Sequence, residues 1–157
     1  MADTVTSQTL KDHASAWAVK LTNISDGTGE TNVTKVNANT LIASNGDGST
    51  RLAITKLFWN VARGTSSLQD PRVTLFWANS IPGGANTTIA TLTGSGVLDL
   101  TTGLQAPFTN NAPNTAGNIM LSTTGFTAQA AYTLVLEGKK TAGYTSRETT
   151  DDGVTGS

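Results

Sequence analysis

The chain has no cysteine, a single histidine and few charged residues for its length of 157 residues. Without cysteine it can form neither a disulfide framework nor a zinc–thiolate site. Charged residues make up 13% of the sequence, against roughly 25% in an average soluble domain. The formal net charge of −1 lacks the basic excess of a typical nucleic-acid-binding domain, so we expect no nucleic-acid partner.

Long apolar runs are also missing. No segment approaches the roughly 20 apolar residues that a membrane-spanning helix needs, and we expect no membrane partner. The first residues, Met1 to Ser7, show neither the basic nor the apolar region of an export signal. The sequence therefore predicts a protein made in a reducing cytoplasm.

Threonine, asparagine, serine, glycine and alanine take the place of the missing residue types. Threonine is β-branched and suits a half-exposed pleated surface, so this composition favours strand over helix. No segment carries apolar residues at helical spacing over three turns. A chain of this length forms one domain with a core of its own.

Eight short segments alternate apolar and polar residues, with turns rich in Gly, Asn and Ser between them. The predicted strands are 14–24, 31–36, 52–62, 72–78, 88–92, 96–100, 118–124 and 132–137. We predict that 88–92 and 96–100 form a hairpin. Together the strands indicate a single-domain antiparallel β-sandwich of jelly-roll type over residues 13–140. Residues 1–12 are expected to form a polar N-terminal arm or an edge segment, and 141–157 a flexible polar C-terminal tail.

The richest apolar strand changes parity. Leu52 and Ile54 fall on one side of it, whereas Leu57 and Val61 fall on the other. A β-bulge near Thr55 restores a single inward face. The alternative is a strand buried on both sides by an oligomer interface.

The aromatic residues divide into two groups by parity. Trp17, Trp59 and Trp77 share their parity with aliphatic neighbours, which favours core positions over a sugar-stacking platform. Phe58 and Phe76 have the opposite parity on the two richest strands. Exposed together, they would form an apolar patch of the kind that marks protein contacts.

Residues able to do chemistry are scarce and scattered. His13 has only Asp12 beside it and no nucleophile, and Ser95 lies in a predicted hairpin turn rather than a nucleophile elbow. Asp99 and Glu137 stand in strands, but their parity places them on the outward face. We therefore predict no catalytic residue and no enzymatic activity.

Two turns contain spaced oxygen ligands, 26–30 and 45–49. Neither has the full spacing or the closing bidentate glutamate of a calcium loop, and both are good turns without an ion. We predict no metal site and no cofactor.

The strand and turn patterns over about residues 17–139 resemble small virion structural proteins of tailed bacteriophages. The segments that carry this resemblance are Val19–Glu30 with Val33–Val36, Leu52–Trp59 with Val73–Ala78, and Gly117–Gly125 with Tyr132–Glu137. It implies a β-sandwich without enzymatic activity, present in many copies on the particle. Head decoration (cement) is the commonest role of such a domain, and the polar residues beyond Lys140 depart from the pattern.

The sequence thus leads us to expect a capsid decoration protein, located in the virion, that binds the major capsid protein and forms a homotrimer. The alternative is a fibre, neck or tail component, or a carbohydrate-binding sandwich that recognises a surface. The expected partner contacts are Phe58, Phe76, Val5, Leu10 and Tyr144.

Overall fold

The computed structural model describes residues 3–13, 15–45, 50–65, 70–79, 85–102, 107–109 and 115–144. Ten strands and one 3-10 helix form within these residues. The strands are β1 Thr4–Asp12, β2 Ala16–Ile24, β3 Val33–Val36, β4 Arg51–Ala62, β5 Arg72–Asn79, β6 Thr87–Leu92, β7 Ser95–Asp99, β8 Phe108–Thr109, β9 Thr115–Thr124 and β10 Ala131–Ala142. The helix is Ala38–Thr40, and no helix in the described ranges is long and apolar enough to cross a membrane.

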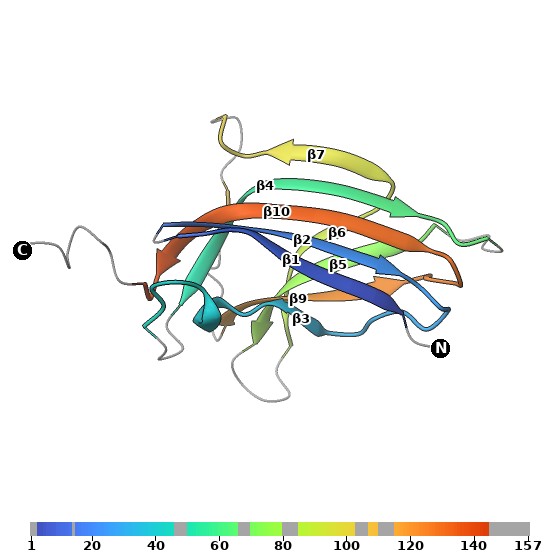
Figure 1. The fold of residues 1–157 in the computed structure, drawn as a ribbon, viewed down its shortest axis with the longest axis horizontal. Helices are drawn as coiled ribbons and strands as arrows, with labels where there is room; N and C mark the ends of the chain where they lie inside the picture. The colour runs from blue at the N-terminus through green and yellow to red at the C-terminus, as the bar shows by residue number, and fades with distance from the viewer. Residues whose placement is uncertain are drawn as a thin grey trace, which may run out of the picture.

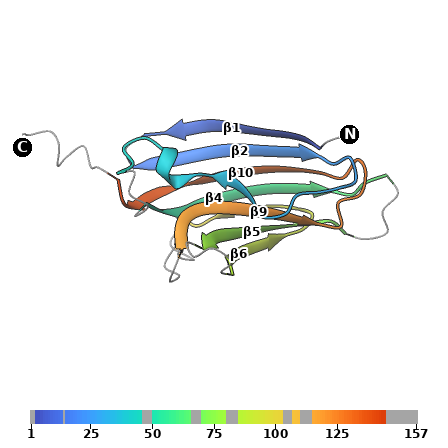
Figure 2. The ribbon, with the colours of Figure 1, turned by 90° about the horizontal axis from the view of Figure 1, so that it is seen from below.

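Two antiparallel sheets pack face to face (Figures 1 and 2). One has the order β1-β2-β10-β4-β7, with the short β8 also paired to β4, and the other has the order β3-β9-β5-β6. The predicted all-β sandwich is confirmed. It has ten strands rather than about eight, because β1 and β8 were not expected as strands.

The core lies between the sheets and follows the predicted alternation. Along β10, Tyr132, Leu134 and Leu136 are buried and alternate with partly exposed residues. The β-bulge in β4 is confirmed: Glu137 pairs with Lys56, Gly138 pairs with Ile54, and the residue between is skipped. The extra residue turns both halves of β4 toward the core.

The predicted hairpin of 88–92 and 96–100 is wrong. Strand β6 pairs with β5 in the four-stranded sheet, whereas β7 pairs with β4 in the other sheet. Residues Thr93 and Gly94 therefore carry the chain across the sandwich. Alternation and a turn glycine predict two consecutive strands. This local pattern does not differ between a chain that folds back within one sheet and a chain that crosses to the opposite sheet.

Strands extend beyond both ends of the expected 13–140 sandwich. Of the two expectations for residues 1–12, a polar arm or an edge segment, the edge segment is the one observed over residues 4–12, because β1 is paired along its length with β2. At the other end, β10 continues to Ala142, and Tyr144 forms a β-bridge with Ser44. The sandwich thus begins before residue 13 and extends beyond residue 140, and the rest of the expected tail, 145–157, lies outside the described residues.

Candidate partner-binding surface

Strand β1 is an edge strand that the second sheet does not cover. It lies at the end of the sheet order beside β2, and Figure 2 shows it at the margin of the sandwich. Every residue from Thr4 to Lys11 is exposed. A strand without burial on either face depends on its ladder and on its end contacts.

Polar contacts hold β1 at both ends. Just before it, Asp3 accepts a hydrogen bond from the side-chain amide of Asn23 at 3.1 Å. At its far end, Asp12 accepts hydrogen bonds from Lys140 Nζ at 2.7 Å and from the Ile42 backbone N–H at 3.0 Å. The strand is therefore fixed in place while its outer edge stays open to a partner.

The open edge is limited to Thr4–Thr9. This stretch has no charge and no proline, so it lacks the usual protection of an edge strand against pairing. A bulge follows at Leu10, where the register with β2 shifts by one residue. Lys11 comes next and forms an ion pair with Glu137 at 3.0 Å. A bulge and a lysine both discourage strand addition, so the accessible ladder ends at Thr9.

The outer face of the same sheet carries a row of apolar cross-strand neighbours. Val135 pairs with Phe58, and Phe58 pairs with Val97. Phe58 is 39% exposed and Val97 is 72% exposed. We call these three residues the outer apolar row. Large exposed apolar side chains that adjoin one another are typical of contact surfaces.

Phe76 does not join this row, and the expected patch of Phe58 with Phe76 is wrong. Strand β5, which carries Phe76, lies in the four-stranded sheet, whereas β4 lies in the other. The outward residues of the two strands therefore point to opposite sides of the sandwich. Of the other expected contacts, Val5 and Leu10 are exposed on β1.

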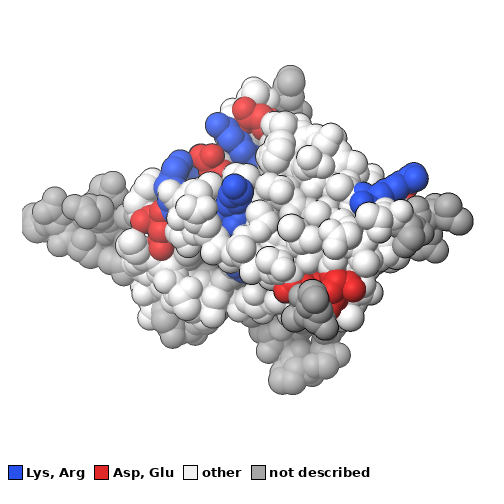
Figure 3. Space-filling model, turned by 45° about the vertical axis from the view of Figure 1, so that its right-hand side comes forward, with Lys and Arg blue, Asp and Glu red and all other residues white. Residues whose placement is uncertain are grey.

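A strip of alternating charge lies next to the outer apolar row. Glu137 pairs with Lys56 and Lys56 with Asp99 across neighbouring strands, and Lys11 extends the strip through its ion pair with Glu137. Hydrogen bonds from Thr101 lower the pKa of Asp99. Figure 3 shows charge confined to small areas of a largely uncharged face. Asp99 and Glu137 thus face outward, as their parity predicts.

Tyr144 is already engaged within the chain. Its hydroxyl donates a hydrogen bond to the backbone carbonyl of Ala38 at 2.6 Å, and Lys140 Nζ lies 5.0 Å from the centre of its ring. Burial, and then the nearby Asp12, raise the pKa of Tyr144 to about 12. Its expected contact with a partner stays a prediction, but its main visible role is to fasten the end of β10.

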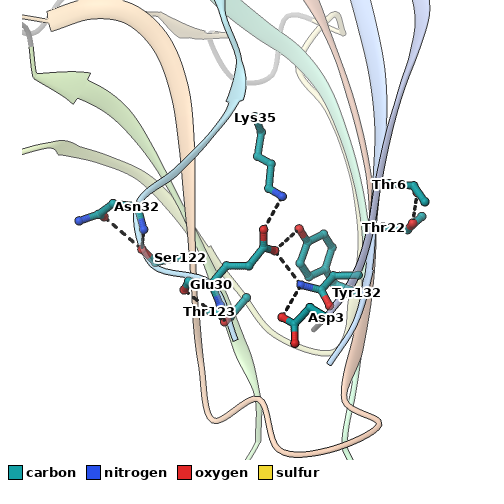
Figure 4. Close-up of polar contacts among 10 residues, drawn as sticks. Asp3, Thr6, Thr22, Glu30, Asn32, Lys35, Ser122, Thr123 and Tyr132 are labelled. Carbon is teal, nitrogen blue, oxygen red and sulfur yellow. Dashed lines mark hydrogen bonds and ion pairs between the residues drawn. The ribbon is translucent and has the colours of Figure 1, made fainter. Parts of the chain in front are cut away.

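A concentrated polar cluster lies between the two sheets, and sequence reasoning missed it. The Glu30 carboxylate accepts hydrogen bonds from the Tyr132 hydroxyl at 2.6 Å, the Asn23 side-chain amide at 2.8 Å and Lys35 Nζ at 2.5 Å (Figure 4). Glu30 is 8% exposed, and Asn23 is fully buried. We call these four residues the Glu30 cluster.

The Glu30 cluster joins four parts of the fold. Asn23 lies on β2, Glu30 on the β2–β3 connection, Lys35 on β3 and Tyr132 on β10. Burial opposes ionisation of Glu30, but hydrogen bonds from Lys35, Tyr132 and Asn23 outweigh it, so the pKa of Glu30 is lowered. Burial, and then the hydrogen bond to Glu30, raise the pKa of Tyr132.

One sequence signal pointed to this cluster. Asn23 continues the parity of Val19 and Leu21, so it is a polar residue on the buried face of a strand. Glu30 gave no such signal, because it follows a glycine-rich turn and reads as a solvated turn residue. Lys35 lies on a short strand whose register only the pairing with β9 defines.

The tryptophans mostly occupy the core. Trp17 and Trp77 are buried, as predicted, whereas Trp59 is partly exposed and donates its indole N–H to the Thr93 carbonyl at 2.9 Å. A hollow of about 350 Å³ opens beside β6 and β8. Its lining is Trp77, Thr87, Thr88, Ile89, Pro107, Phe108 and Thr109. Because Trp77 is only 3% exposed, it offers no face on which a sugar ring could stack.

The remaining chemical candidates stay apart. His13 lies in the turn between β1 and β2, where its backbone N–H donates to the Ala16 carbonyl at 3.0 Å, and neighbouring Asp12 contacts Lys140 instead. Asp26 accepts hydrogen bonds from the Thr28 hydroxyl and N–H, which lower its pKa. Of the turn 45–49, only residue 45 lies within the described residues. Those residues contain no group of three or more His, Asp or Glu suited to a metal ion.

No protein-family model matches the chain, and no curated protein matches its sequence significantly.

Proposed function

We propose that this chain is a non-enzymatic structural protein that decorates the capsid of a tailed bacteriophage and attaches through β1. The observation that carries the proposal is the open ladder of Thr4–Thr9, which is uncharged, exposed on both faces and fixed at its ends. We propose a phage particle because the strand patterns resemble those of phage virion proteins. We propose attachment through β1 because its ladder is open.

The mechanism is strand addition onto a repeated surface. An extended segment of the major capsid protein pairs with β1, so that main-chain hydrogen bonds supply affinity. The outer apolar row adds burial on the same sheet. Each contact is modest, but many copies on one lattice act together and resist the pressure of the packaged DNA.

The topology supports the jelly-roll and trimer parts of this proposal. The order β2-β10-β4-β7 opposite β3-β9-β5-β6 suits a jelly roll, in which consecutive strands are shared between two sheets. Because the capsid segment occupies β1, the remaining sheet edges are β7, β3 and β6, and contacts between unlike edges of neighbouring copies can close into a ring. Sedimentation at micromolar concentration should give a trimer, and a monomer alone would reject that part.

The rival binding function has less support. A carbohydrate-binding sandwich needs exposed aromatic rings beside polar groups, but Trp17 and Trp77 are buried. The partly exposed Trp59 already donates its indole N–H to a backbone carbonyl. We therefore do not propose carbohydrate recognition.

The direct test is binding to purified phage capsids in their expanded form. The proposal predicts stoichiometric co-sedimentation and a higher melting temperature of the capsid. Absence of binding to every capsid form would reject the proposal.

Two matched variants test the role of β1. Ser7→Lys places a charge on the open ladder and should weaken capsid binding by at least tenfold. Thr91→Lys places the same charge at an exposed position of β6, the edge of the other sheet, and should leave binding unchanged. Equal effects of the two variants would show that β1 is not the attachment edge.

A further inference from the structure

The Glu30 cluster places an amine and a carboxamide on the two oxygens of one buried carboxylate. Lys35 Nζ lies 2.5 Å from Glu30 Oε2, and Asn23 Nδ2 lies 2.8 Å from Glu30 Oε1. The side chain of Lys35 is 5% exposed and that of Glu30 is 7% exposed. A nucleophile, an electrophile and a proton carrier are thus held together away from water.

We propose that Lys35 and Asn23 form an intramolecular isopeptide bond, with Glu30 transferring the protons. The bond joins Lys35 Nζ to Asn23 Cγ and releases the amide nitrogen of Asn23 as ammonia. It links β2 of one sheet to β3 of the other, and so ties the two halves of the sandwich covalently in a chain without cysteine. This bond is independent of the proposed attachment through β1.

The reaction balances without any co-reactant. The Lys35 ammonium passes one proton to Glu30, and the neutral amine attacks Asn23 Cγ. Glu30 then returns that proton to Nδ2 as the Cγ–Nδ2 bond breaks and ammonia leaves. The new amide nitrogen gives its extra proton to the ammonia, so an ammonium and a carboxamide become a secondary amide and an ammonium ion.

The surroundings suit this chemistry. General acid–base transfer requires a group within hydrogen-bond reach of the protons it moves, and Glu30 contacts both nitrogens. Asp3 also accepts a hydrogen bond from Asn23 Nδ2, at 3.1 Å, so two carboxylates flank the departing nitrogen. Asn23 Oδ1 is buried and has no hydrogen-bond partner among the described residues, which is uncommon in a folded protein.

One movement is needed before the bond can form. The Lys35 amine has to leave Glu30 Oε2 and come within about 3–3.5 Å of Asn23 Cγ, the reach of a productive encounter. The lysine stem has four flexible carbons, and rotation about them carries Nζ along the carboxylate. Burial of the cluster keeps water from competing.

A second buried lysine provides the matched control. Lys140 Nζ lies 2.7 Å from Asp12 Oδ1 and 2.6 Å from the Ile42 carbonyl oxygen, and its side chain is fully buried. The Asp12 carboxylate accepts its other hydrogen bonds from the Ile42 backbone N–H, so among the described residues no side-chain amide is held beside Lys140. Burial and an ion pair with a carboxylate are therefore common to both lysines, whereas only the Glu30 cluster also holds a side-chain amide that the amine can attack.

Intact mass spectrometry of the full chain, purified, incubated to constant mass and then denatured, tests the proposal. We expect a mass lower than the sequence mass by one ammonia. Trypsin should fail to cleave after Lys35 and should release residues 21–51 as one peptide closed into an internal loop by the cross-link. This digest separates the cross-link from ammonia lost at any other asparagine, which leaves cleavage after Lys35 intact.

Three variants complete the test. Lys35→Arg keeps the positive charge but should retain the full mass. Glu30→Gln should slow bond formation by about 10²–10⁴-fold. Lys140→Arg should lose ammonia like the parent. Should Glu30→Gln fail to fold, Lys35→Arg still decides the matter. Full mass with normal cleavage after Lys35 in the parent chain, or ammonia loss that persists in Lys35→Arg, would overturn the proposal.

Discussion

Strands β1 and β10 flank the same strand, β2, yet their situations differ completely. Both pair with β2 in antiparallel ladders of similar length. Strand β10 alternates buried and partly exposed residues along its first eight positions, whereas β1 is exposed from Thr4 to Lys11. The second sheet covers β10 and does not cover β1. Hydrogen-bonded pairing therefore places both strands, but only the opposing sheet makes one of them part of the core.

This difference assigns different tasks to the two strands. Burial of apolar side chains stabilises a fold by roughly 25 cal/mol for each Å² removed from water, and β10 contributes Tyr132, Leu134 and Leu136 to that burial. Strand β1 contributes little burial, so its sequence is free to serve a partner. We expect substitutions in β10 to change stability and substitutions in β1 to change binding.

The largest expected effect comes from truncating a core side chain of β10. Leu134 is fully buried, and Leu134→Ala should lower the free energy of unfolding by about 2–5 kcal/mol. Val5→Ala on β1 should change it by less than about 0.5 kcal/mol. Urea unfolding followed by tryptophan fluorescence measures both. Similar losses in the two variants would contradict the comparison.

A glycine of β10 gives the next largest effect. A Cβ atom at Gly138 would lie 1.9 Å from the Ala53 carbonyl oxygen and 2.8 Å from the Trp17 ring. Gly138→Ala should therefore shift the backbone of β10 and cost about 1–3 kcal/mol. Thermal unfolding is the measurement, with Ser7→Ala on β1 as the control. An unchanged melting temperature for Gly138→Ala would contradict this prediction, because it would mean that the backbone of β10 can shift to accommodate a Cβ atom without loss of stability.

Two truncations test where the end of β10 is fastened. A chain ending at Tyr144 removes a segment with one apolar residue, Val154, and should unfold like the full chain. A chain ending at Lys140 also loses the last strand residues and the Tyr144–Ala38 hydrogen bond, and should be less stable by about 1–3 kcal/mol. Calorimetry compares the two. Equal stability of the two truncated chains would contradict this expectation and would support the predicted end of the sandwich at residue 140.

The smallest effect concerns the Tyr144 hydroxyl and its pH dependence. Tyr144→Phe removes the hydrogen bond to Ala38 and should cost about 0.5–1.5 kcal/mol at neutral pH. Folding raises the pKa of Tyr144 from 10.0 to about 12. The contribution is therefore complete below pH 10 and is lost as the pH rises through 12. Unfolding free energies of both proteins across this window should converge, and a constant difference would contradict the assignment.

Much of the fold could be predicted from local patterns. The parity change in β4 led to the bulge near Thr55, and the alternation around Leu134 led to the buried face of β10. Pairings between distant strands could not be predicted in the same way. Phe58 and Phe76 looked like neighbours because their strands follow one another, but which sheet each strand joins depends on contacts far along the chain.

The residues of the candidate surface likewise divide into those that local patterns could predict and those that depend on the pairing of distant strands. Exposure of Val5, Leu10 and Phe58 follows from polar surroundings and parity, and the sequence indicated it. The partnership of Phe58 with Val97 depends on β7 joining β4. The Glu30 cluster contains residues as far apart in the sequence as 23 and 132, and no one of them by itself indicates that the cluster forms.

The amino-acid sequence by itself determined that the chain is built from alternating strands, with little charge and scarce reactive groups, because side-chain period and composition act over a few residues. Only the tertiary structure decided that β1 lies uncovered, that Phe58 and Phe76 face opposite sides, and that Asn23, Glu30 and Lys35 meet. Those outcomes depend on which strands pair across long separations in the sequence. The free energy that favours one pairing over another comes from contacts throughout the core rather than from any one segment.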